Sequence, residues 1–186
     1  MRKKRRQPAP MTFADYIALA KRNLIGIDVT TIKPPKTLCG VELPHDLNDL
    51  TMDALTDIMQ LKDGNLTDLA RIVLGIDPKL LLQEPAQDVL GFFNFCTTEY
   101  KRINTLFESA KLPPTSQEIR AGIESLSFGI FGTIDWYARR MGITDHNEVM
   151  KVKWMRVYQC ASNDTKTALY QRQLNQVMIA DAKTRR

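Results

Sequence analysis

Most of the chain shows a helical spacing of apolar residues, in which apolar side chains recur three, four and seven positions apart. The longest such stretch follows Pro85 and includes Val89, Phe92, Phe93, Cys96, Tyr100, Ile103, Phe107 and Ala110. This spacing is typical of a helix with one buried face. It predicts a helix of about 25 residues, or about 38 Å, since each residue adds 1.5 Å. Leu112-Pro113-Pro114 ends it.

Start and stop signals predict shorter helices on both sides of this one. Before it, helices are expected from Thr12, from Thr51 to about Leu61, and from Thr67 to Leu74, with a single turn at Pro78–Gln83. After it, Thr115-Ser-Gln-Glu118 is a capping-box sequence that opens the next helix. Two more are expected at the end of the chain. One is capped by Thr144 or Asp145 and includes Trp154 and Tyr158, and one opens at Asn163 or Asp164 with Tyr170, Leu174, Val177 and Met178 facing inward.

One segment lacks the helical period. Thr37–Leu43 has β-branched residues and follows Pro34-Pro35, which favours a short strand or hairpin. The predicted fold is therefore mainly α, a single-domain bundle of about six helices with a short β or extended segment near the N-terminus. We expect a disordered basic arm at residues 1–11, a helical domain at 12–180 and a basic C-terminal tail at 181–186.

The net charge of +5 comes from one short segment. Arg2, Lys3, Lys4, Arg5 and Arg6 are consecutive, and without them the chain has 21 basic and 21 acidic residues. A nucleic-acid-binding domain usually has a basic stripe on its folded surface. The five arm residues are therefore the candidate nucleic-acid contacts, and the body of the chain is expected to bind something else. No apolar run approaches the ~20 residues of a membrane span, so no membrane contact is expected.

Gly122, Gly129 and Gly132 raise the possibility of a phosphate-binding loop. Such a loop needs glycines between a strand and a helix, and here a capping box precedes them. In one continuous helix, Gly122 and Gly129 would lie within ~20° of each other and Gly132 ~60° further round. We therefore expect the three glycines to allow close helix packing, with a tight turn between two helices as the alternative.

Residues for catalysis or metal binding are sparse. The chain has His45 and His146, and its cysteines are Cys39, Cys96 and Cys160, without zinc-site spacing. Because free cysteines are mostly buried, we expect the three thiols to be reduced and packed, as in an intracellular protein. We also expect no metal, no cofactor and no enzymatic activity. A Cys–His catalytic pair is the remaining enzymatic alternative.

Aromatic residues supply the candidate binding surface. Phe95 falls off the apolar face of the long helix, while Phe128, Phe131 and Trp136 flank the glycines. Large aromatic side chains often anchor protein interfaces. These four residues are the predicted protein-interface residues.

Several segments in order resemble small helical proteins encoded among the structural and assembly genes of tailed bacteriophages, some described as tail assembly chaperones. The segments are LCGVELP, DLNDLT, a long aromatic-rich helix, PPTSQEIRAGIESLSFGIFGTIDWYA, VKWMRVYQ and ALYQRQL, within about Thr37 to Met178. The resemblance implies no catalytic residue. It implies residence in the host cytoplasm or the virion and a phage protein as partner, with the tape measure or a tail or connector component as candidates.

The expected function is thus a non-enzymatic phage assembly protein, similar to a tail assembly chaperone, that binds another phage protein through apolar and aromatic surface. The alternatives are a structural virion protein, in the connector or tail, and a nucleic-acid-associated module that uses the basic arm. A second copy of the chain is a further candidate partner.

Overall fold

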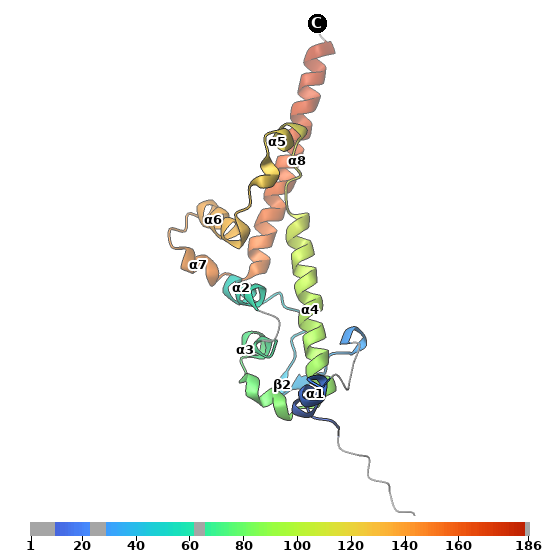
Figure 1. The fold of residues 1–186 in the computed structure, drawn as a ribbon. Coiled ribbons are helices and arrows are strands. Elements are labelled where there is room, and N and C mark those ends of the chain that lie inside the picture. The colour runs from blue at the N-terminus through green and yellow to red at the C-terminus, as the bar shows by residue number, and fades with distance from the viewer. Residues whose placement is uncertain (1–9, 23–28, 62–65, 185–186) are drawn as a thin grey trace, which may run out of the picture. The chain divides into compact units, whose positions relative to one another are not determined.

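The computed structural model describes residues 10–22, 29–61 and 66–184, and these are mainly helical, as the sequence predicts (Figure 1). Its contacts divide the chain into two compact units, where the sequence predicts one bundle. Unit 1 comprises Met1–Leu47 with Asp57–Tyr100, and unit 2 comprises Asn48–Thr56 with Lys101–Arg186. The boundary falls within helices α2 (Met52–Gln60) and α4 (Ala86–Ser109), so each contributes to both units.

Unit 1 begins with helix α1 (Phe13–Ala20), which Thr12 caps as expected. The Thr12 side chain accepts a hydrogen bond from the Asp15 amide, and the Asp15 carboxylate accepts one from the Thr12 amide. The Phe13 amide donates to the Glu84 carbonyl oxygen and the Ala86 amide to the Met11 carbonyl oxygen. These bonds tie the start of α1 to the start of α4.

The predicted hairpin is present as strands β1 (Thr37–Leu38) and β2 (Val41–Glu42), paired antiparallel with Leu38 opposite Val41. Both residues of its turn have positive φ, at 49° for Cys39 and 78° for Gly40. Two-residue hairpin turns with positive φ at both positions match the twist of the strands, which explains the glycine here. Between α1 and β1 lies a 3-10 turn, η1 (Val29–Thr31).

The rest of unit 1 surrounds the first part of α4. Helix α3 (Asp68–Leu74) ends at Gly75 with a left-handed φ of 69°, and η2 (Pro78–Gln83) is the single turn that the sequence predicts. The core is formed by buried side chains from α1, β1, α3, η2 and α4: Phe13, Leu38, Leu69, Ala70, Leu81, Val89, Leu90, Phe92, Phe93 and Cys96. The Phe13 and Phe93 rings meet edge to face at 5.8 Å, a favoured aromatic geometry.

Gly91 lets the extended segment before the hairpin lie directly on α4. A Cβ atom at Gly91 would lie 2.3 Å from the Lys33 carbonyl oxygen. One turn later, the Asn94 side-chain amide donates to the carbonyl oxygens of Thr30 and Ile32. The glycine and the asparagine together fix where this segment crosses the helix.

The two chain segments that form unit 2 are joined by a short antiparallel bridge between Thr51 and Lys153. The Met52 amide donates to the Val152 carbonyl oxygen, and the Trp154 amide donates to the Leu50 carbonyl oxygen. Trp154 is fully buried and its ring contacts Phe107 and Tyr158. Arg102 lies 5.8 Å above the same ring, a distance at which a cation and an aromatic face attract.

Two predicted helix boundaries in unit 2 are wrong. Residues 115–141 form α5 (Ser116–Arg120), a 3-10 turn η3 (Ile123–Ser125) and α6 (Gly129–Met141), rather than one helix. The last two helices are α7 (His146–Met150) and α8 (Trp154–Thr184), and Asn163 and Asp164 lie inside α8. The helix also continues through residues 181–184, which we expected to form a tail.

Within the described ranges, no helix is both long enough and apolar enough to cross a membrane.

Candidate protein-binding surface

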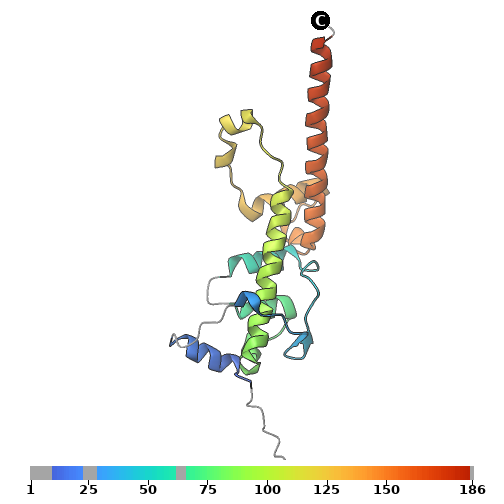
Figure 2. The ribbon, with the colours of Figure 1, turned by 90° about the vertical axis from the view of Figure 1, so that its right-hand side faces the viewer.

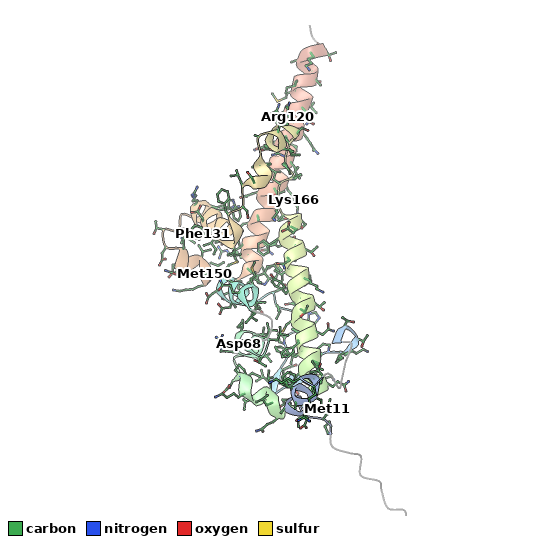
Figure 3. All side chains as sticks on the ribbon, viewed as in Figure 1. Met11, Asp68, Arg120, Phe131, Met150 and Lys166 are labelled. Carbon is green, nitrogen blue, oxygen red and sulfur yellow. The ribbon has the colours of Figure 1, made fainter. Side chains whose placement is uncertain are left out.

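A group of large apolar side chains is exposed between α5 and the first turn of α6. We call Ile119, Ile123, Leu126, Phe128 and Phe131 the α5–α6 apolar surface (Figure 3 labels Phe131). Phe128 is the most exposed, at 71%, followed by Leu126 at 59% and Phe131 at 58%. Large apolar side chains that are exposed as a group often mark an interaction site.

The segment begins at the predicted capping box. The Thr115 side chain accepts a hydrogen bond from the Glu118 amide, and the Glu118 carboxylate accepts from the Thr115 amide at 2.7 Å. The hydrogen bond from the Thr115 amide is the main cause that lowers the pKa of Glu118, followed by the Thr115 hydroxyl and then the charge of Arg172. Arg172 of α8 also donates to the Pro113 carbonyl oxygen at 2.6 Å. These contacts hold the start of α5 beside α8.

The glycines shape this segment in a way that differs from the prediction. Gly122 has a φ of 83° and Gly129 a φ of 55°, and a Cβ atom at Gly129 would meet nothing within 4 Å. Both glycines therefore turn the chain, which is the alternative of a tight turn between two helices. The prediction that they allow close helix packing is wrong. Positive φ favours glycine because a Cβ atom is strained there.

Gly132 is different because its contact is local. A Cβ atom there would lie 2.6 Å from the Cβ of Phe128, one turn earlier in the chain. The Gly132 amide donates to the Phe128 carbonyl oxygen, so the two residues share the first turn of α6. Gly132 thus makes room for Phe128 in its exposed position, and no second helix is involved in this contact.

Phe131 is held by helix α7. Its ring centroid lies 5.2 Å from that of His146, whose Nε2 atom is 3.3 Å from the Asp135 carboxylate. The same carboxylate pairs with Arg139 at 2.6 Å. Phe131 therefore has a supported ring with an exposed face, an arrangement suited to a contact with another apolar side chain.

The other two predicted interface residues are less accessible. Phe95 is half-buried and packs against the unit 1 core, so the expectation that it faces away from the apolar side is wrong. Trp136 is also half-buried, with its ring 6.2 Å from that of Tyr137. The exposed part of the predicted interface is therefore Phe128 and Phe131.

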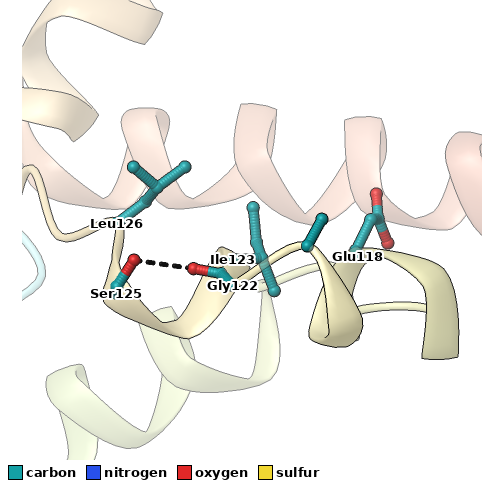
Figure 4. Close-up of a pocket in the computed structure, with 6 residues that line it drawn as sticks. Glu118, Gly122, Ile123, Ser125 and Leu126 are labelled. Carbon is teal, nitrogen blue, oxygen red and sulfur yellow. Dashed lines mark hydrogen bonds between the residues drawn. The ribbon is translucent and has the colours of Figure 1, made fainter.

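A small open pocket is formed by the end of α5 and the η3 turn (Figure 4). It is lined by Glu118, Ala121, Gly122, Ile123, Ser125 and Leu126. The Ser125 hydroxyl donates to the Gly122 carbonyl oxygen at 2.7 Å, which closes the η3 turn. Apart from the Glu118 carboxylate at its edge, the lining is small or apolar, so it suits an apolar side chain better than a charged ligand.

Two of the three cysteines are poor candidates for a reactive thiol. Burial raises the pKa of Cys96 to about 12, and burial together with Glu84 raises that of Cys39 to about 11. Both thiols are thus protonated at neutral pH and weakly nucleophilic. Among the described residues, no group of three or more His, Cys, Asp or Glu side chains is placed to hold a metal ion.

The candidate nucleic-acid contacts Arg2–Arg6 lie outside the described residues.

One exposed surface was missed by the sequence reasoning. Tyr170, Leu174, Val177 and Met178 of α8 were expected to face inward, but all four are exposed. Their helical spacing predicts a shared face correctly, but it cannot distinguish a face that packs within the chain from one left open.

Comparisons with protein-family models, with curated proteins and with solved structures find no match to this chain.

Proposed function

We propose that this chain is a non-enzymatic assembly protein that binds another protein through the α5–α6 apolar surface. The observation that carries the proposal is the exposure of Phe128, at 71%, and of Phe131, at 58%, on a segment shaped by Gly122, Gly129 and Gly132. Exposing two aromatic rings in water is unfavourable, and a partner that covers them regains that free energy. The resemblance to tail assembly chaperones makes a phage tail, connector or tape-measure protein the partner to test first.

Local structure suits a role in binding another protein. The apolar side chains lie on short elements, α5 with five residues and η3 with three. Such elements expose much of their backbone and adapt to a partner more easily than a long packed helix does. A transient chaperone in the host cytoplasm and a subunit retained in the virion would both use this surface.

The test is co-purification of the full chain with tail, connector and tape-measure proteins expressed together with it. The informative variant is the double substitution Phe128→Ser and Phe131→Ser, and the matched control is Leu80→Ser, which changes a 51%-exposed leucine of η2. We expect the native chain and the control to retain a stoichiometric partner after a high-salt wash, and the double variant to lose it.

Thermal melting separates lost binding from lost folding. Because Phe128 and Phe131 are already exposed, we expect the double variant to melt close to the native chain. Retention of the partner by the double variant would contradict the proposal. The proposal would also be contradicted if only nucleic acid co-purified with the chain and was released as the salt concentration rose. Such salt dependence is typical of contacts to phosphate groups.

A further inference from the structure

The second half of α8 is uncovered. Every residue from Gln173 to Thr184 is exposed, and we call this stretch distal α8. Just before it, Arg172 makes the contacts to Pro113 and Glu118 that hold α8 to the start of α5. The red end of the helix extends past α5, α6 and α7 in both Figure 1 and Figure 2.

One apolar stripe begins at Tyr170 and continues along distal α8. Tyr170, Leu174 and Val177 lie within ~60° of each other around the helix, and Met178 borders them. Their exposures are 63%, 43%, 56% and 59%. Asp181 continues the stripe, because it follows Val177 by four positions. Ile179 points away from this face, ~160° from Val177, since two residues turn the helix by about 200°.

Distal α8 gains little stability from packing within the chain. Most helical stability in proteins comes from packing of an apolar face, and the apolar residues of distal α8 are exposed. Distal α8 also contains Asn175, Val177, Ile179, Asp181 and Thr184, which are moderate or poor helix formers. Packing against a partner helix would supply the stabilisation that its sequence lacks.

We propose that distal α8 pairs with distal α8 of a second copy of this chain, with the two helices antiparallel. Tyr170, Leu174, Val177 and Asp181 are spaced four, three and four residues apart, as in the core positions of a coiled coil. The order of these intervals is the same from either end of the stripe. An antiparallel partner therefore places Leu174 opposite Val177 and Tyr170 opposite Asp181.

Charge selects the antiparallel orientation. In the antiparallel pair, each Asp181 carboxylate faces a Tyr170 hydroxyl, which can donate a hydrogen bond to it. In a parallel pair, the two Asp181 carboxylates would meet at the same core position, where like charges repel. The stripe is apolar in its centre and has polar groups at both ends. Two copies therefore match when their helices run in opposite directions.

The small size of the stripe sets the expected strength. Stable interfaces bury about 1,200–2,000 Å², and a few apolar side chains from each helix fall below that range. We therefore expect a weak dimer with a dissociation constant of about 10–1000 µM, populated where assembly raises the local concentration. The stripe is separate from the α5–α6 apolar surface, so this proposal does not depend on the proposed function.

The first test is sedimentation equilibrium of the full chain over a range of concentrations. Val177→Gln removes an aliphatic side chain from the stripe, and Ile179→Gln makes the same kind of change at 57% exposure on the opposite side. We expect Val177→Gln to weaken dimerisation at least tenfold and Ile179→Gln less than threefold. A native chain that stays monomeric at millimolar concentration, or equal effects of the two substitutions, would overturn the proposal.

The second test determines orientation with two substitutions at one position. Tyr170→Lys and Tyr170→Glu both remove the ring but place opposite charges there. In the antiparallel pair the lysine faces Asp181 and the glutamate is repelled by it, so we expect Tyr170→Glu to dimerise at least tenfold more weakly than Tyr170→Lys at low salt. Equal weakening by both would exclude the antiparallel register, because in a parallel pair each charge meets its own copy.

Discussion

At the scale of single residues, Gly91 gives the sharpest prediction. Alanine normally stabilises a helix by about 1 kcal/mol relative to glycine. Here a Cβ atom would lie 2.3 Å from the Lys33 carbonyl oxygen, and that backbone would have to move. Overpacking typically costs about 1–3 kcal/mol, so we expect Gly91→Ala to lower the free energy of unfolding in urea. Thr98→Ala, at an exposed position of the same helix, should change it by less than about 0.5 kcal/mol.

A second residue-scale prediction concerns the glycine beside Phe128. A Cβ atom at Gly132 would lie 2.6 Å from the Cβ of Phe128, which is close to the main chain and cannot rotate away. We expect Gly132→Ala to displace Phe128 and weaken partner binding at least fivefold, while the melting temperature stays near that of the native chain. Co-purification and thermal melting check this together, and a variant that binds normally would show that the position of Phe128 is unimportant.

The sequence predicts contacts between residues that are close in the chain, but it does not predict contacts between residues that are distant in the chain. The Thr115–Glu118 capping box is present as predicted, because both residues lie within one turn. Gly91 was not singled out because its neighbour, Lys33, lies far away in the chain. Among the interface candidates, Phe128 and Phe131 are exposed but Phe95 and Trp136 are half-buried, since burial depends on elements that the local pattern does not describe.

At the scale of elements, most helices begin where the sequence predicts, but some do not end there. Helix α3 stops at Gly75 and β1–β2 forms at the predicted hairpin, because glycines with positive φ fix both sites. The separation of α7 from α8 was missed. It depends on the bridge between Thr51 and Lys153, in which the Met52 amide donates to the Val152 carbonyl oxygen. That pairing is a tertiary contact, so the local periodicity gives no signal for it.

Helix α5 provides a prediction for pH. The pKa of Glu118 lies below its ordinary value of 4.5, chiefly because the Thr115 amide donates to its carboxylate. A lowered pKa in the folded state means that the stabilisation is complete above pH 4.5 and is lost as the pH falls through the folded pKa. We expect the amide resonance of Thr115 to follow this titration by NMR.

Glu118→Gln is the matched control, because glutamine also closes a capping box but does not titrate. In that variant the Thr115 resonance should stay constant through the acidic range in which the native chain shifts. The same shift in both proteins would show that another carboxylate causes it and that the capping bond is not the source of the lowered pKa.

At the scale of the whole molecule, charge and apolar surface point to different partners. The formal net charge is +5, and Arg2–Arg6 account for all of it, since the rest of the chain has 21 basic and 21 acidic residues. The α5–α6 apolar surface and distal α8 both lie within the neutral remainder. Apolar contacts depend little on salt, whereas each phosphate contact adds about −0.9 to the slope of log affinity against log salt on B-DNA.

Deleting residues 2–6 therefore separates the two modes of binding. We expect the shortened chain to keep its protein partner, because the exposed aromatic rings are unchanged, and to lose any affinity for DNA measured by fluorescence anisotropy. Replacing the same five residues by glutamine is the control for length. Since a chain with no net charge associates more readily, both variants should be compared at equal, low concentration. Loss of the protein partner in both would assign the interaction to the basic arm and contradict binding through Phe128 and Phe131.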